Sequence, residues 1–265
     1  MENIETAIRA AISAGRAIMD IYEGDDFKVE NKEDKSPLTI ADKKANDIIN
    51  EFLLPTGIPI ISEENKQLSY IERKDWNRCW IVDPLDGTKE FIKKNGEFTV
   101  NIALVDNQRP EVGVIYAPAM KTLYFAKVSE GKAYKCVIEG SEPLEVIMEH
   151  AKSIRPSEYD ARIKVVGSRS HMNEDTIKFI KTLENNQLKP VDIVSKGSSL
   201  KFCLVAEGAA HVYPRFAPTM EWDTAAGQAI CEAVGLKVVV RKTGEPIRYN
   251  REDLLNQHFL VSNEG

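Results

Sequence analysis

The sequence predicts an α/β (α+β) protein built in two halves, and three patterns indicate it. Apolar residues recur at helical spacing over roughly the first 54 positions. A block of short apolar runs separated by turn residues follows, which favours antiparallel strands. Strands and helices then alternate, as is typical of a second α/β sheet. We therefore predict an N-terminal α+β domain at residues 1–155 and a C-terminal α/β domain at residues 156–265.

Two helices open the predicted first half. Apolar side chains repeat every three or four residues from Ile4 to Met19, and this pattern stops near Gly24. Thr39 can cap a second amphipathic helix that runs from Ile40 to about Leu54, where a Pro-Thr-Gly segment breaks it. The charged segment between these helices is expected to be a loop.

Six short apolar runs then predict the strands of the first half, and a mixed stretch at residues 143–156 is expected to cross to the second half. The strands are expected at residues 58–62, 79–82, 98–105, 112–116, 123–128 and 133–137.

The second half is predicted as alternating strands and helices. Its strands are expected at residues 163–167, 191–194, 211–213 and 236–240, and its helices at residues 174–183, 199–207 and 224–234.

Composition excludes several classes of function. The 265 residues carry a formal net charge of −6, which disfavours a broad surface for nucleic acid or an anionic membrane. An anionic ligand would therefore need bound cations. The four cysteines form no C-x-x-C pair, so we expect buried thiols in a reducing compartment rather than a zinc site or disulfides. The N-terminus lacks a basic, apolar leader and no long apolar run occurs, which predicts a cytoplasmic protein without a membrane-spanning segment.

The most informative segment is Trp80-Ile-Val-Asp83-Pro-Leu-Asp86-Gly87-Thr88. Two carboxylates and the backbone C=O of Leu85 can converge on hard cations, while Gly87 lets the backbone approach an anion and Thr88 adds a hydroxyl. The alternative is an ordinary polar turn after a strand, since Asp, Pro and Gly are common turn residues.

Two further acidic segments extend this pattern. Glu63 and Glu64 end a predicted strand, and Asp223 follows Trp222 at the start of a predicted helix. A solvated pair and an N-cap are the simpler explanations. Together with the previous segment, however, these residues form an all-oxygen set that suits magnesium better than zinc. Such a site activates water directly, which is consistent with the absence of nucleophile-elbow, P-loop and dinucleotide-binding motifs.

These motifs, in this order and spacing, resemble the signature of the magnesium-dependent, lithium-sensitive inositol monophosphatase superfamily. The resemblance covers nearly the whole chain and includes Ser36-Pro-Leu-Thr39-Ile-Ala-Asp42. Within the superfamily, four segments look most like the CysQ-type 3'(2'),5'-bisphosphate nucleotidases. These are Gly167-Ser-Arg-Ser-His171, Leu200-Lys-Phe-Cys-Leu-Val-Ala-Glu-Gly208, Tyr213-Pro-Arg215-Phe and Leu254-Leu-Asn256-Gln-His-Phe259.

The resemblance implies a layered α-β-α-β-α sandwich and a role for each matching residue. Two or three Mg²⁺ ions would bind: one on Glu63, Asp83 and the Leu85 carbonyl, a second on Asp83, Asp86 and Asp223, and a weaker third beside Glu63. Glu63 and Thr88 would activate the water, with Asp42 hydrogen-bonded to Thr88. The implied substrate-binding residues are Glu63, Leu85, Asp86, Gly87, Thr88, Ser168, His171, Gly197, Lys201 and Asp223, with Arg215 a further candidate for a 5'-phosphate.

The implied reaction is hydrolysis of adenosine 3',5'-bisphosphate to AMP and phosphate, and the sulfated analogue, 3'-phosphoadenylyl sulfate, is a second expected substrate. Two alternatives stay open: an inositol monophosphatase or other sugar phosphatase, and a non-catalytic nucleotide-binding protein. The expected partner is a small phosphorylated nucleotide rather than nucleic acid. The chain is expected to be a monomer or homodimer, and peripheral attachment to the inner membrane stays open.

Overall fold

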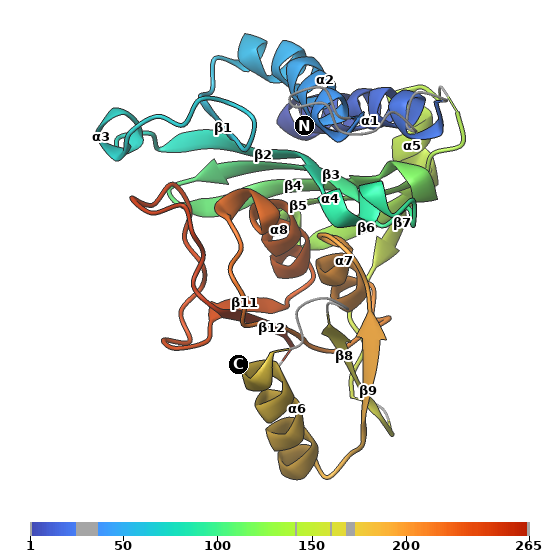
Figure 1. Ribbon diagram of the computed structural model, residues 1–265, viewed down its shortest axis with the longest axis vertical. Helices are drawn as coiled ribbons and strands as arrows, with labels where there is room; N and C mark the ends of the chain where they lie inside the picture. Colours follow the sequence, from blue (N-terminus) through green and yellow to red (C-terminus); the bar gives the residue numbers. More distant parts are fainter. Residues whose placement is uncertain (1, 25–36, 141, 160, 168–172, 264–265) are drawn as a thin grey trace.

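The computed structural model describes residues 2–24, 37–140, 142–159, 161–167 and 173–263. Helices and sheets alternate in layers along the long axis of the molecule (Figure 1). Helices α1 and α2 cover one face of a large sheet, and α7 and α8 cover the other. The strands of the second half form the next layer, with α6 outermost. The predicted α-β-α-β-α sandwich is therefore confirmed.

The first layer consists of α1 (Glu2–Glu23) and α2 (Pro37–Leu53), which pack against each other and against the large sheet. Both predicted helices are present. However, α2 begins three residues earlier than expected, so Thr39 lies inside the helix and the prediction that it caps the helix is wrong. Proline is a favoured residue in the first turn of a helix, because its missing N–H has no intrahelical partner there.

Seven strands of the described residues form the large sheet in sequence order, with β1 parallel to β2 and every later pair antiparallel. The six predicted strands are confirmed, with shifted ends. A seventh was missed, because its Lys-Ser-Ile sequence has no apolar alternation and only pairing with β6 defines it. The strands are β1 (Ile60–Ser62), β2 (Arg78–Asp86), β3 (Thr99–Asp106), β4 (Arg109–Ala117), β5 (Thr122–Lys127), β6 (Lys132–Val137) and β7 (Lys152–Ile154).

Short helical segments connect these strands. They are η2 (Leu54–Thr56), α3 (Tyr70–Arg73), α4 (Thr88–Ile92), η3 (Pro118–Met120), η4 (Val128–Glu130) and α5 (Leu144–His150).

The described residues of the second half form two small sheets rather than the single sheet expected from the sequence. In one, β8 and β9 are parallel; in the other, β12 lies between β10 and β11 in antiparallel pairing. A bridge between Val165 and Val212 links them. The elements are β8 (Ile163–Gly167), α6 (Glu174–Gln187), β9 (Val191–Ser195), α7 (Leu200–Ala206), β10 (Tyr213–Arg215), η5 (Glu221–Asp223), α8 (Ala225–Ala233), β11 (Lys237–Val240) and β12 (Phe259–Ser262).

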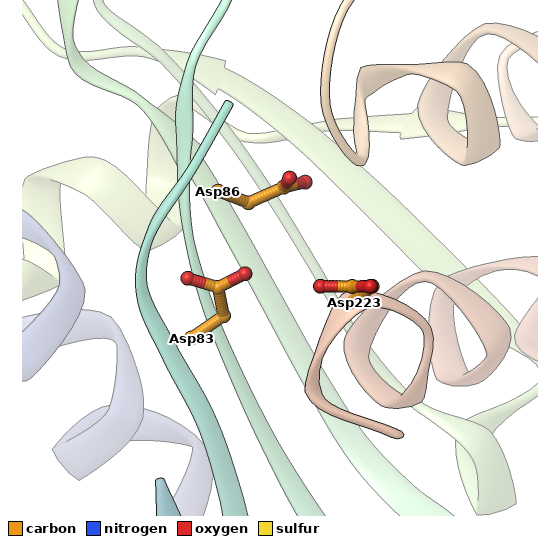
Figure 2. Close-up of side chains that lie close together, drawn as sticks. All are labelled: Asp83, Asp86 and Asp223. Atoms are coloured by element: carbon orange, nitrogen blue, oxygen red, sulfur yellow. The ribbon is translucent and has the colours of Figure 1, made fainter. Parts of the chain in front are cut away.

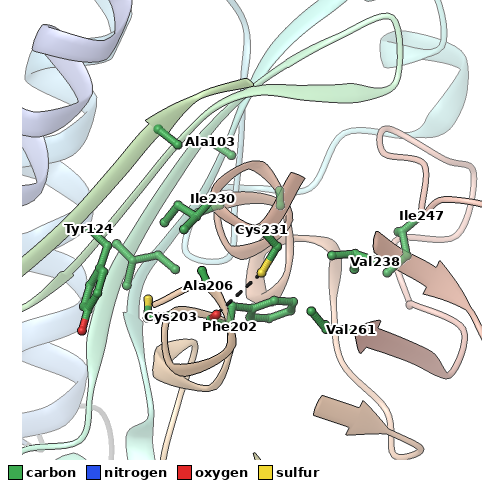
Figure 3. Close-up of a cluster of buried hydrophobic side chains, with 14 of the residues drawn as sticks. Ala103, Tyr124, Phe202, Cys203, Ala206, Ile230, Cys231, Val238, Ile247 and Val261 are labelled. Carbon is green, nitrogen blue, oxygen red and sulfur yellow. Dashed lines mark hydrogen bonds between the residues drawn. The ribbon is translucent and has the colours of Figure 1, made fainter. Parts of the chain in front are cut away.

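The two faces of β2 enter different hydrophobic clusters. Trp80 and Val82 pack with residues of α1 and α2, whereas Cys79 and Ile81 belong to the cluster that contains α7 and α8. Figure 3 shows part of this second cluster, in which side chains of the large sheet, the two helices and the second half meet. Cys79 and Ile81 therefore face α8, and the same alternation brings Asp83 to that face just before the end of the strand.

All four cysteines are buried and free, as the sequence predicted. Within the described part of the chain, no helix is both long enough and apolar enough to span a membrane. The division near residue 155 and the cytoplasmic location stay predictions.

Candidate active site

A β-bulge at the end of β2 brings two carboxylates to one face of the sheet. Asp83 lies opposite Asn101 of β3, and Asp86 lies opposite Thr99, so β2 has one residue more than β3 between these pairs. In a regular strand, side chains three positions apart point to opposite faces. The extra residue reverses this, because a bulge re-aims the side chains beyond it. Both carboxylates therefore face the layer that contains α8.

Asp223 reaches the same place from the second half. It ends η5, one residue before the N-cap of α8, and the adjacent Trp222 is buried as the sequence predicted. Oδ2 of Asp223 accepts a hydrogen bond of 2.7 Å from the backbone N–H of Met220, so capping explains one oxygen only. Carboxylate oxygens of Asp83, Asp86 and Asp223 all lie within 4.8 Å of one another (Figure 2). An all-oxygen group this close could hold a hard divalent cation.

The electrostatics of this group also fit a cation. Burial raises the pKa of Asp83 well above its ordinary value, and the charges of Asp86, Glu63 and Asp223 raise it further. Burial and Asp86 raise the pKa of Asp223 to about 7. These carboxylates are partly removed from water and repel one another, and a bound cation would relieve both effects by favouring their ionised forms.

Three other predicted residues stand around this group. Glu63 follows β1 at the exposed rim. Burial of its carboxyl, followed by the charges of Glu64 and Asp86, raises its pKa, while a hydrogen bond with Asp83 lowers it. Asp42 on α2 has its pKa raised to about 8 by burial and by the charges of Glu64 and Glu63. Thr88 is exposed at the start of α4.

The expected hydrogen bond between Asp42 and Thr88 is not among those formed within the described residues, so the role of Asp42 stays a prediction.

Leu85 and Gly87 occupy special backbone positions in the same turn. The register gives Leu85 no partner on β3, and its N–H donates 3.0 Å to Oδ1 of Asp83. Gly87 has φ = 101° and precedes α4, and a Cβ on it would come within 3.1 Å of the backbone of Glu97 and Phe98. A side chain would be strained here both by conformation and by contact.

Asn101 and Ser199 also contact the carboxylates, and the sequence analysis did not identify them. Oγ of Ser199 lies 2.8 Å from Oδ2 of Asp86, and Nδ2 of Asn101 lies 2.9 Å from that Oγ. Thr99 and Asn101 are buried polar residues at alternate positions of a strand whose other residues up to Val105 are apolar. That pattern could have indicated them, because buried polar side chains need partners.

A pocket of about 120 Å³ adjoins the carboxylates, with Asp86 and Asp223 on its wall together with Lys201 and Arg215. Lys201 is buried, and burial lowers its pKa to about 8. Among the described residues, Nε of Arg215 and Oγ of Ser198 are buried without a hydrogen-bond partner. Unsatisfied buried donors of this kind indicate a place where a ligand binds. The sequence analysis named Lys201 and Arg215 but missed Ser198.

Gly197 lines this pocket as well, as its predicted role requires. Ser168 and His171, the remaining predicted contacts, lie outside the described residues.

The comparison with known protein families identifies the group to which this arrangement belongs. The model of the inositol monophosphatase family matches residues 1–265. The chain belongs to the inositol monophosphatase family. The family resemblance inferred from the carboxylate motifs is therefore confirmed.

Relatives within the family share the full length of the chain. The chain is 44% identical over 263 residues to the 3'(2'),5'-bisphosphate nucleotidase CysQ of Salmonella typhimurium, covering 98% of this chain and 99% of the relative. It is 43% identical to the CysQ of Buchnera aphidicola, covering 98% and 93% respectively. The expected similarity to the CysQ group is thus confirmed.

Solved structures of family members have the same fold as this chain. The crystal structure of CysQ from Bacteroides thetaiotaomicron, a bacterial member of the family, superposes with a TM-score of 0.91 at 49% identity, covering 99% of this chain and 98% of that one. Inositol monophosphatase II of Staphylococcus aureus has a TM-score of 0.76 at 22% identity, covering 100% and 90%. At that identity the second structure supports the fold alone.

Proposed function

We propose that this protein is a magnesium-dependent 3'(2'),5'-bisphosphate nucleotidase that hydrolyses adenosine 3',5'-bisphosphate to AMP and phosphate. One observation carries the proposal: a cluster of acidic residues adjoins a pocket lined by a buried lysine and an arginine. The cluster suits a scissile phosphate held through cations, and the pocket suits a second anionic group. The full-length similarity to the CysQ nucleotidases supports this choice of substrate. The 3'-phosphate of 3'-phosphoadenylyl sulfate fits the same description.

The proposed metal ligands are those that the family resemblance implies, and three of them lie together in the structure. Glu63, Asp83 and the Leu85 carbonyl would hold one Mg²⁺, while Asp83, Asp86 and Asp223 would hold a second, and Glu63 would contact a third. Bound Mg²⁺ neutralises phosphate oxygens and lowers the pKa of a coordinated water. Oxygen-only ligands and the close approach of the three aspartates support magnesium rather than a softer metal.

The remaining residues at the rim of the site would bind and deprotonate the attacking water. Glu63 and the hydroxyl of Thr88 would hold that water, with Glu63 accepting its proton. Asp42 is proposed to orient the Thr88 hydroxyl, and its raised pKa reflects burial close to Glu63 and Glu64. Leu85 to Thr88, with the open backbone at Gly87, would line the scissile phosphate.

The second phosphate of the substrate would bind in the cationic part of the pocket. Lys201 and Arg215 provide the charge, and Ser198 provides a buried hydroxyl that has no hydrogen-bond partner in the described part of the chain. Hydrogen bonds between charged groups are stronger than neutral ones, and they gain further strength where water is excluded. Gly197 would allow close backbone approach, and Ser168 and His171 stay proposed contacts to the nucleoside.

A phosphate-release panel tests the proposal. Adenosine 3',5'-bisphosphate, adenosine 2',5'-bisphosphate, inositol 1-phosphate and fructose 1,6-bisphosphate are compared in Mg²⁺, with and without Li⁺, and after removal of metal by a chelator. We expect the highest kcat/KM with adenosine 3',5'-bisphosphate, AMP as the product, inhibition by Li⁺ and no release without metal.

Faster release from inositol 1-phosphate would instead identify an inositol monophosphatase. Binding of the nucleotide without any phosphate release would identify a non-catalytic nucleotide-binding protein.

A further inference from the structure

Ser199 lies where three segments of the site meet. Its Oγ is 2.8 Å from Oδ2 of Asp86 on β2 and 3.0 Å from the backbone carbonyl oxygen of Asp223 on η5. It is also 2.9 Å from Nδ2 of Asn101 on β3. Only 2% of Ser199 is exposed, so water does not compete for these contacts. A single hydroxyl therefore connects two acidic residues that belong to different halves of the chain.

Counting protons gives the direction of each bond. Oδ1 of Asn101 accepts from Oγ1 of Thr99 at 3.0 Å, which leaves the Nδ2 group of Asn101 as a donor to Ser199. The Ser199 oxygen is thus an acceptor toward Asn101, and its own single proton is free for another partner. The carboxylate oxygen of Asp86 lies closer than the Asp223 carbonyl, at 2.8 Å against 3.0 Å, so this proton is assigned to Asp86.

This arrangement fixes which oxygen of Asp86 faces the cations. Oδ2 is held by Ser199 and lies 3.5 Å from Nδ2 of Asn101. No residue in the described part of the chain donates a hydrogen bond to Oδ1. That oxygen is therefore the one available to a metal ion, and the rotation of the carboxylate is set by Ser199.

We propose that Ser199 is a positioning residue for the metal ligand Asp86, an inference that rests on the magnesium site proposed above. Ser199 also immediately precedes α7, which carries Lys201. It therefore couples the geometry of the metal ligands to the wall of the pocket that receives the second phosphate. Partners that orient metal-ligating carboxylates typically contribute about 10- to 100-fold to metal affinity or activity.

The test is a Mg²⁺ titration of the melting temperature for the wild type and Ser199→Ala. We expect the Mg²⁺ concentration that gives a fixed rise in melting temperature to increase about 10- to 100-fold in the variant. Phosphate release should require correspondingly more Mg²⁺, while kcat at saturating Mg²⁺ recovers most of its wild-type value. A lesion that only loosened the fold would lower the melting temperature at every Mg²⁺ concentration without changing the concentration needed for a given rise.

Ser157→Ala is the matched control. Its Oγ donates to the carbonyl of Gly208 at 2.8 Å, so the variant loses a serine hydrogen bond of the same length outside the carboxylate group. We expect this variant to need the same Mg²⁺ concentration as the wild type for the same rise in melting temperature.

Asn101→Ala gives a second, independent variant and replaces Ser199→Ala if that protein does not fold. Because both residues act through one hydrogen-bonded chain, the double variant should show less than the sum of the two single losses of Mg²⁺ affinity. The proposal would be overturned if the two losses of Mg²⁺ affinity were fully additive, or if Ser199→Ala needed no more Mg²⁺ than the wild type. A wild-type protein that Mg²⁺ neither stabilises nor activates would instead refute the proposed function.

Discussion

Asp83 is the most deeply buried residue of the acidic group, with only 1% exposed. The sequence alone predicted its role as a ligand candidate, because an apolar strand ends at it and two other acidic segments accompany it. The sequence could not reveal Ser199 as the partner of Asp86, since 113 residues separate them and the contact depends on how the two halves pack.

The pH dependence of stability follows from these buried acids. The ordinary pKa of an Asp is 3.8, and in the folded protein the pKa values of Asp42 and Asp223 are about 8 and about 7. The folded protein therefore retains protons that the unfolded chain has released. Its free energy of unfolding without metal should fall as the pH rises from about 4 to about 8. Mg²⁺ should reverse this loss, and should stabilise more at pH 8 than at pH 5.

Melting curves in chelator and in Mg²⁺ measure this effect, and Asp83→Asn is the diagnostic variant. Removing one buried charge should make the metal-free protein less sensitive to pH and abolish stabilisation by Mg²⁺. Turnover should drop more than about 100-fold, since a direct ligand matters more than an outer partner. Asp47→Asn, at an exposed position on α2, should behave as wild type. A wild-type protein whose melting temperature without metal rises from pH 5 to pH 8 would contradict this account.

At the scale of elements, the apolar pattern was sufficient for α1 and for the long strands of the large sheet. The apolar residues of α1 recur at helical spacing because one face is buried, and those of the long strands form continuous runs because both faces are buried. The pattern failed at β7, β12 and the end of β2. The predicted strand stopped at Val82, whereas β2 continues to Asp86 through Pro84 and the bulge. Pairing with β3 determines that extension, and a single strand's sequence does not encode it.

The segment that leads into α7 depends on close packing at Gly197. Its N–H donates 2.9 Å to Oε2 of Glu97, whose Oε1 lies 3.2 Å from Nζ of Lys196. A Cβ on Gly197 would lie 2.7 Å from Cγ of Glu90 and 2.8 Å from the carbonyl oxygen of Glu97. The segment must therefore move if any side chain is added.

We expect Gly197→Ala to reduce the free energy of unfolding by about 1–3 kcal/mol through overpacking. Because the pocket wall shifts, KM for adenosine 3',5'-bisphosphate should rise more than kcat falls. Thermal melts and steady-state kinetics measure both effects. Gly140→Ala is the control, since a Cβ there meets nothing within 4 Å. Equal effects of the two substitutions would refute the packing explanation.

At the scale of the whole molecule, the site lies where the layers meet. The large sheet provides Asp83 and Asp86, the turn before α8 provides Asp223, and α7 provides Lys201. One hydrophobic cluster contains residues from both sides of the predicted boundary near residue 155. The sequence supplied the acidic residues and their order. Only the folded layers place the buried lysine beside them, and the proposal of a bisphosphate site rather than a monophosphate site rests on this juxtaposition.

The most direct test compares kcat/KM for adenosine 3',5'-bisphosphate and adenosine 3'-monophosphate, at saturating Mg²⁺, in the wild type and in Lys201→Met. The wild type should prefer the bisphosphate. Lys201→Met should lose about 10- to 100-fold on the bisphosphate, the value of one or two charge-assisted hydrogen bonds, with little change on the monophosphate. A wild type without preference for the bisphosphate, or an equal loss on both substrates in the variant, would contradict the proposed nucleotidase site.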